Sequence, residues 1–138
     1  MSVDMTKWQE IAKENIHKRP AGTGRLAGKI TIVTGAAQGF GKGIAEELYR
    51  EGATIVIADM NQALAEQVAA EMGERACAIS VNVSNEESVA ALVSQTVEKF
   101  GGLDIMVANA GVVRSGPIAT FEQKDFEFVT AINYTGLF

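Results

Sequence analysis

The sequence is short of several residue types, and each shortage excludes a class of protein. Its 138 residues include one cysteine, Cys77, so no disulfide can form within the chain. The single histidine, His17, lies in a charged segment near the N-terminus, which leaves Cys77 without an evident partner for thiol catalysis. We therefore expect Cys77 to be a core residue of the apolar run 76–81. We also expect the protein to reside in the cytoplasm, which is a reducing compartment. We also expect no metal site.

Long apolar runs and an excess of positive charge are missing too. No run approaches the roughly 20 apolar residues that a membrane-spanning helix needs, and the N-terminus lacks the apolar centre of a signal peptide. The net charge is −5, whereas nucleic acids and anionic membranes bind basic surfaces. We therefore expect neither a nucleic acid nor a membrane as a partner. Hydrophobic residues make up 47% of the chain, which is typical of a globular domain.

Residues 1–28 differ in pattern from the rest of the chain. Apolar residues between Trp8 and Ile16 follow helical spacing among charged ones, and Pro20 and two glycines then interrupt the pattern. We expect an N-terminal extension that contains a short amphipathic helix and a flexible joint. Such an extension can lie on the surface of its own domain or dock to another domain or subunit, and we favour the first alternative.

Residues 29–138 alternate apolar runs with amphipathic segments, strand before helix, four times over. The predicted strands are 30–33, 54–58, 76–81 and 103–108. The predicted helices are 39–51, 62–72, one from the capping-box pattern 84–87 to Phe100, and one that begins near Glu122 and is still helical at the last residue. Unbroken apolar strands are typical of a parallel sheet that is covered on both faces. We expect a Rossmann-like, doubly wound α/β sheet, truncated after its fourth strand and the following helix.

A glycine-rich turn joins the first predicted strand to the first predicted helix. Gly35 permits a tight turn, Gly39 lets the backbone approach a phosphate, and Gly41 lets the helix pack closely. The helix N-terminus supplies free N–H groups and partial positive charge to an anion. Asp59 ends the second predicted strand, where a carboxylate accepts hydrogen bonds from a ribose and repels a 2′-phosphate. The sequence therefore predicts NAD as the cofactor, with NADP disfavoured.

Four motifs together resemble the short-chain dehydrogenase/reductase family. They are the glycine spacing from Thr34 to Gly41, Asn82-Val83-Ser84, Ala108-Asn109-Ala110-Gly111 and Ile132-Asn133-Tyr134-Thr135-Gly136. The resemblance extends from about residue 26 to the end of the chain. It implies an NAD-dependent oxidoreductase that interconverts a small alcohol and a carbonyl by hydride transfer. The residues from Gln38 to Gly41 and the charged N-terminal segment suggest the branch of this family that oxidises sugars and polyols.

The resemblance also implies roles for individual residues. The implied cofactor-binding set is Gly35, Gln38, Gly39, Phe40, Gly41, Asp59, Asn82, Val83, Asn109, Ala110 and Gly111. Asn133 would be the one member of the family's catalytic set that is present, and it would hold a water in the proton relay. Asn82 stands where the family has Asp, and we expect its amide oxygen to accept from the adenine amine with a modest loss of affinity. Ala108 replaces the first Asn of its motif.

The family's catalytic Tyr-x-x-x-Lys has no counterpart in this sequence. The two tyrosines are Tyr49 and Tyr134, and neither has Lys four residues later. We therefore expect the chain to be the cofactor-binding, N-terminal part of an oxidoreductase, inactive alone, whose full-length form is a homo-oligomer. One alternative is a non-catalytic NAD-binding or interaction module that shields the open edge of its fourth strand. A site for S-adenosylmethionine is another, which the spacing of the glycines disfavours.

Overall fold

The computed structural model describes residues 5–15, 18 and 23–138. Within these residues, four parallel strands form one sheet in the order β3-β2-β1-β4. The strands are β1 (Ile30–Thr34), β2 (Thr54–Asp59), β3 (Ala76–Ser80) and β4 (Ile105–Val107). Strand order reverses between β1 and β4, which is the place where open α/β sheets bind their ligands.

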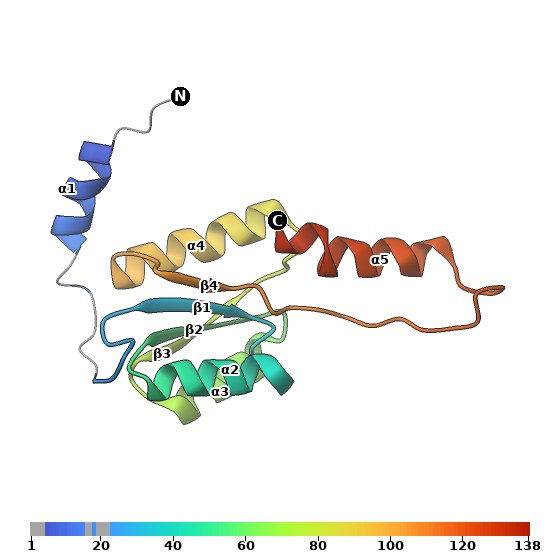
Figure 1. The fold of residues 1–138 in the computed structure, drawn as a ribbon, viewed down its shortest axis with the longest axis horizontal. Coiled ribbons are helices and arrows are strands. Elements are labelled where there is room, and N and C mark those ends of the chain that lie inside the picture. Colours follow the sequence, from blue (N-terminus) through green and yellow to red (C-terminus); the bar gives the residue numbers. More distant parts are fainter. Residues whose placement is uncertain (1–4, 16–17, 19–22) are drawn as a thin grey trace.

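Helices cover both faces of this sheet (Figure 1). The helices are α1 (Met5–Asn15), α2 (Gly39–Arg50), α3 (Gln62–Met72), α4 (Glu86–Phe100) and α5 (Gln123–Asn133), followed by the 3₁₀ turn η2 (Thr135–Leu137). The first face carries α2 and α3, and the second carries α4. A long connection after β4 leads to α5, which lies beyond the N-terminal end of α4 (Figure 1). The expected Rossmann-like α/β fold is confirmed.

The central strands are buried because each has helices on both sides. Ile55 and Ile57 of β2 pack in the cluster beneath α2 and α3, whereas Val56 of the same strand packs with Leu92 and Phe100 of α4. Successive residues of a strand point to opposite faces, so both faces must be apolar. This explains why the strands are visible in the sequence as apolar runs.

Cys77 belongs to the cluster beneath α4, as expected of a core residue. Its side chain is almost completely buried, and this burial raises the pKa of the thiol. The thiol is therefore protonated at neutral pH, which is the unreactive form.

The described part of the N-terminal extension touches the domain at two places. A Cβ at Gly101, which follows α4, would overlap the carbonyl oxygen of Asn15, so the end of α1 lies against the end of α4. Nearer to β1, the N–H of Leu26 donates to the carbonyl of Glu51 (2.7 Å), and the guanidinium of Arg25 donates twice to the Glu51 carboxylate. This guanidinium holds the pKa of Glu51 below its ordinary value.

The expected helix of the extension is thus present, with the bounds of α1. Ile16 and Pro20, which helped to define the end of that helix and the joint, lie outside the described residues. Docking of the extension to another domain or subunit stays a prediction.

The beginning of α4 and the end of α5 differ from the sequence prediction. The capping residue of α4 is Asn85, whose side chain accepts from the N–H of Ser88 (2.7 Å), because Ser84 is instead hydrogen-bonded to Asn82. The final helix does not continue to the last residue: α5 ends at Asn133, and η2 follows. Gly136 lies in that 3₁₀ turn, and glycine is a poor helix former.

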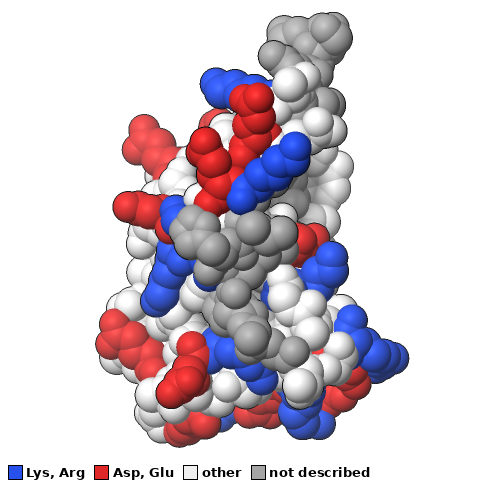
Figure 2. Space-filling model, turned by 90° about the vertical axis from the view of Figure 1, so that its left-hand side faces the viewer, with Lys and Arg blue, Asp and Glu red and all other residues white. Residues whose placement is uncertain are grey.

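Charges of both signs share the side of the molecule on which α1 lies. Figure 2 shows Lys and Arg side chains interspersed there with Asp and Glu, and no broad basic patch is visible on this face. Of the helices in the described part of the chain, none is both long and apolar enough to cross a membrane.

Candidate cofactor-binding site

The glycine-rich turn lies at the carboxyl edge of the sheet, between β1 and α2. Gly35 and Gly39 both have positive φ angles, of +64° and +58°, which L-residues with side chains rarely adopt. A Cβ at Gly41 would overlap the carbonyl oxygen of Gly35 and the side-chain nitrogen of Asn109, whereas a Cβ at Gly39 would meet no atom within 4 Å. The turn is therefore closed on its inner side at Gly41 and open to a ligand at Gly39.

The N-terminus of α2 has no side-chain cap. Asn61 caps α3 by accepting from the N–H of Leu64 (3.2 Å), and Asn85 caps α4 in the same way. By contrast, Gln38 makes no capping hydrogen bond to α2, and the first turn of α2 contains no acidic residue. The N–H groups and partial positive charge of this helix end are therefore available to an anion. A phosphate group satisfies both requirements.

Asp59 lies beside this turn. One oxygen of its carboxylate accepts from the N–H of Ala37 (3.1 Å), and the other accepts from the N–H of Asn61 (3.0 Å). The nearby cation in the first turn of α2, Lys42, is paired with Glu71 on α3 (3.2 Å). The structure therefore places the uncapped N-terminus of α2 next to the carboxylate of Asp59, and Lys42 is engaged in an ion pair with Glu71.

The end of β1 is fastened to the end of β4 through Thr34. The hydroxyl of Thr34 accepts from the N–H groups of Asn109 and Ala110, both at 3.0 Å, and donates to the carbonyl of Val107 (3.4 Å). The side-chain nitrogen of Asn109 also donates to the carbonyls of Thr34 (2.9 Å) and Gly35 (3.3 Å). Sequence reasoning assigned no role to Thr34, although a threonine placed directly before the turn could have suggested one.

Asn82 and Val83 follow β3 at the same edge. The side-chain oxygen of Asn82 accepts from the N–H of Ser84 (3.0 Å) and from its hydroxyl (2.7 Å). This oxygen was expected to accept from the adenine amine, but both of its lone pairs are used by Ser84. Val83 packs against the core beneath α4, and a Cβ at Gly136 would crowd it.

Asn133 fixes the segment that follows Gly111. Its side-chain oxygen accepts from the N–H of Val112, and its side-chain nitrogen donates to the carbonyl of Val112, each at 2.8 Å. Gly111 lies directly beneath this pair, since a Cβ there would be 3.5 Å from the Asn133 oxygen. The amide of Asn133 is therefore a clamp on the backbone, and its contact with a water stays a prediction.

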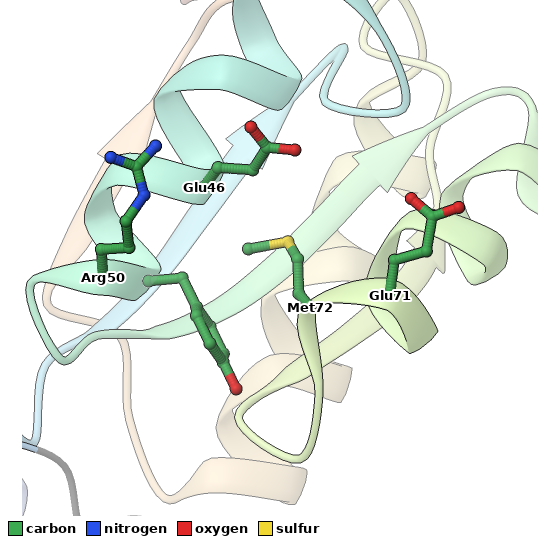
Figure 3. A pocket seen from close by; sticks show the side chains of 5 residues that line it. Glu46, Arg50, Glu71 and Met72 are labelled. Atoms are coloured by element: carbon green, nitrogen blue, oxygen red, sulfur yellow. The ribbon is translucent and has the colours of Figure 1, made fainter.

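Several hollows lie outside the glycine-rich turn in the described part of the chain. The first, of about 210 Å³, is formed by residues near the C-terminal ends of α2 and α3: Glu46, Tyr49, Arg50, Glu71 and Met72 (Figure 3). It is remote from Gly39, which begins α2. The second, of about 660 Å³, lies between α4 and η2 and has Val83, Val89 and Phe138 in its wall. No group of three or more His, Cys, Asp or Glu suited to a metal ion occurs in the described ranges.

Comparison with known proteins identifies the family. Residues 29–138 match the family model described as short chain dehydrogenase. The chain is 38% identical over 112 residues to a sorbitol dehydrogenase of Cereibacter sphaeroides, covering 81% of this chain and 44% of that protein. It is 40% identical over 118 residues to tropinone reductase-like 1 of Erythroxylum coca, covering 83% and 43%.

A solved structure agrees with these sequence relatives. The crystal structure of a 3-ketoacyl-(acyl-carrier-protein) reductase from Brucella melitensis, complexed with NADH, has a TM-score of 0.78 and 38% identity, over 81% of this chain and 47% of that one. The chain thus spans less than half the length of the proteins it matches. On this sequence match, fold and site arrangement, the chain belongs to the short-chain dehydrogenase/reductase family.

Proposed function

We propose that residues 29–138 bind NAD for an oxidoreductase that interconverts an alcohol and a carbonyl. The observation that carries this proposal is the contact between Ala37 in the glycine-rich turn and the Asp59 carboxylate, 3.1 Å apart. It supports the proposal because an uncapped helix N-terminus and a carboxylate, which could accept from a ribose, lie close together at the same edge of the sheet. The NADH complex of the Brucella reductase supports the proposal.

The residues present fit such a cofactor. The open space at Gly39 leaves room for pyrophosphate oxygens against the N–H groups of α2, and the Asp59 carboxylate would accept from the adenosine ribose hydroxyls. Gln38 and Phe40 flank Gly39, and Phe40 is exposed. Asn109, Ala110 and Gly111 would line the path across the β1–β4 reversal. When bound, NAD supplies the hydride acceptor.

Proton transfer needs a group that this chain does not contain in the family's arrangement. Carbonyl reduction requires a general acid matched to neutral pH, and neither Tyr49 nor Tyr134 is followed by Lys at the required spacing. We therefore expect no turnover from these 138 residues alone. In this proposal Asn133 helps to position the groups of the site and does not itself transfer the proton. A non-catalytic NAD-binding or interaction module remains the alternative. It is favoured by the position of β4 at one edge of the described sheet, where β4 pairs with β1 alone.

The substrate, oligomeric state and cellular compartment of the whole protein are also proposals. The sorbitol dehydrogenase among the relatives supports a polyol or sugar, and the tropinone reductase-like relative supports the wider class of alcohols and carbonyls. We propose a homo-oligomer in the cytoplasm.

The choice between NAD and NADP is tested at Asp59. We expect the chain to bind NADH at least about tenfold more tightly than NADPH, because the carboxylate repels a 2′-phosphate. Asp59→Asn removes the charge and keeps one acceptor for the neighbouring N–H groups, so the preference should narrow to about threefold or less. The measurement is titration of each reduced cofactor, followed by its fluorescence.

Asp125→Asn on α5 is the matched control, since it makes the same change of charge away from the turn. It should leave the NADH to NADPH preference unchanged. Equal binding of both cofactors by the wild-type chain, or an Asp59→Asn variant with the full preference, would refute the assignment.

A further inference from the structure

Helix α1 is not covered along its length by the domain to which it belongs. Its C-terminal end lies against Gly101, and no helix or strand of the described part packs beside the rest of it (Figure 1). It has 11 residues, whereas an isolated helix needs about 12–15 residues to be even marginally stable in water. A helix of this length is therefore stabilised by a surface that packs against it.

The charged side chains of α1 form no ion pair among the residues that the structure describes. These side chains, all exposed, are Lys7, Glu10, Lys13 and Glu14. Glu14 is four residues after Glu10, so their like charges destabilise the helix. It also lies in the last turn, where the helix dipole favours a cation. The position of Glu14 is thus unfavourable in an isolated helix, which indicates that its charge makes a contact outside α1.

Lys7 and Glu14 lie on the same side of α1, because they are about two turns apart. In a heptad register with Trp8 at position a and Ile11 at position d, Lys7 and Glu14 both occupy position g, which flanks the apolar strip of the helix. One flank of the strip therefore carries a cation near its beginning and an anion near its end.

We infer that α1 pairs with α1 of a second copy of this chain, with the two helices antiparallel. Two-fold symmetry brings equivalent surfaces together, and the g positions of an antiparallel pair face each other. Lys7 of each copy then lies opposite Glu14 of the other, which gives two equivalent ion pairs. In a parallel pair position g faces position e, where Met5 and Ala12 carry no charge. The surface is therefore complementary to itself in the antiparallel arrangement.

This interface is independent of the cofactor site, and it is small. The glycine-rich turn lies at the carboxyl edge of the sheet, whereas α1 meets the domain at Gly101, directly after α4. Each α1 helix is about 16 Å long, so a pair of them buries less than the roughly 1,200 Å² of a stable interface. We therefore expect a weak, reversible dimer.

Sedimentation equilibrium of the 138-residue chain tests the pairing. Over concentrations from about 10 µM to 1 mM, the wild type should show a monomer–dimer equilibrium. Lys7→Glu replaces both ion pairs by contacts between like charges, and Glu14→Lys does the same, so each should weaken the dimer at least about tenfold. Glu14→Lys also places a cation four residues after Glu10, which stabilises α1 itself, so loss of the helix cannot explain its effect.

Mixing the two variants tests the orientation of the helices. One chain then carries two anions at position g and the other carries two cations, so a heterodimer regains both ion pairs. An equimolar mixture of Lys7→Glu and Glu14→Lys should therefore associate with a dissociation constant within about threefold of the wild-type value. The double variant Lys7→Glu/Glu14→Lys should do so as well, because it exchanges the partners within each pair.

Lys13→Glu and Glu10→Lys are the matched controls. In the same register these residues occupy positions f and c, on the side away from the apolar strip, and the substitutions make the same changes of charge. Each should leave the dissociation constant within about threefold of the wild-type value.

Four results would overturn the inference: a wild-type chain that stays monomeric throughout this range, a dimer that Lys7→Glu does not weaken, controls that weaken it equally, or a mixture that associates no better than either variant alone. Each of these results leaves the proposed NAD site standing, because titration with NADH measures that site separately.

Discussion

Gly41→Ala is expected to weaken NADH binding by at least about 100-fold. The added Cβ would overlap the carbonyl oxygen of Gly35 and the side-chain nitrogen of Asn109, and the first of these atoms belongs to the backbone of the turn. The turn must then move away from α2, which displaces the N–H groups that we assign to the pyrophosphate. Fluorescence titration with NADH measures the loss, and far-UV circular dichroism shows whether the variant is folded.

Gly43→Ala provides the control within the same helix. A Cβ at Gly43 would meet no atom within 4 Å, and its φ angle is ordinary. Alanine is a better helix former than glycine, so this variant should gain about 0.5–1 kcal/mol in stability and bind NADH as the wild-type chain does. If a folded Gly41→Ala variant binds NADH within about threefold of the wild type, the cofactor does not depend on the geometry of this turn.

Thr34→Val is expected to lower the free energy of unfolding by about 2 kcal/mol. The hydroxyl of Thr34 accepts from the N–H groups of Asn109 and Ala110 at the end of β4, and valine has the same shape without an acceptor. The N–H of Asn109 retains the carbonyl of Val107 (3.1 Å) as a second acceptor, so the principal loss falls on Ala110. Denaturation by urea, followed by circular dichroism, gives the value.

Thr31→Val, on the same strand, should have the opposite effect. Thr31 is completely buried, and its hydroxyl has no hydrogen-bond partner in the described part of the chain. Replacing an unpaired buried hydroxyl by a methyl group should raise the free energy of unfolding by up to about 1 kcal/mol. Equal losses in the two variants would mean that the contacts of Thr34 with the end of β4 contribute nothing specific to stability.

The sequence predicts the sheet well because the physical cause of its pattern is local. A parallel strand covered on both faces must be an apolar run, and the central strands β1 and β2 are such runs. The bounds of α3 also agree with the prediction, since Asn61 caps its beginning and Gly73 follows its end. The approach of the glycine-rich turn to Asp59 follows from topology, because the carboxyl ends of parallel strands share one edge.

What the sequence does not predict depends on contacts between distant residues or on competition between neighbours. Ser84 and Asn85 can both cap a helix, and the choice falls on Asn85 because Ser84 is engaged by Asn82. The clamp of Asn133 on Val112 joins residues 21 positions apart and has no periodic signature. These contacts determine how the site is oriented, so sequence reasoning located the edge of the sheet but not the direction of the Asn82 amide.

The most direct test of the proposed site is a map of backbone amide chemical shifts during titration of the ¹⁵N-labelled chain with NADH. We predict saturable changes at Gly35 to Lys42 and at Asp59 to Asn61, where the turn and the carboxylate meet. Tyr49, Arg50 and Met72, in the hollow at the far ends of α2 and α3, should stay unchanged and serve as the internal control (Figure 3). Glu46 and Glu71 of the same hollow are left out of this control because both are paired with Lys42. Changes confined to that hollow, or none with NADH in large excess, would contradict a dinucleotide site at the glycine-rich turn.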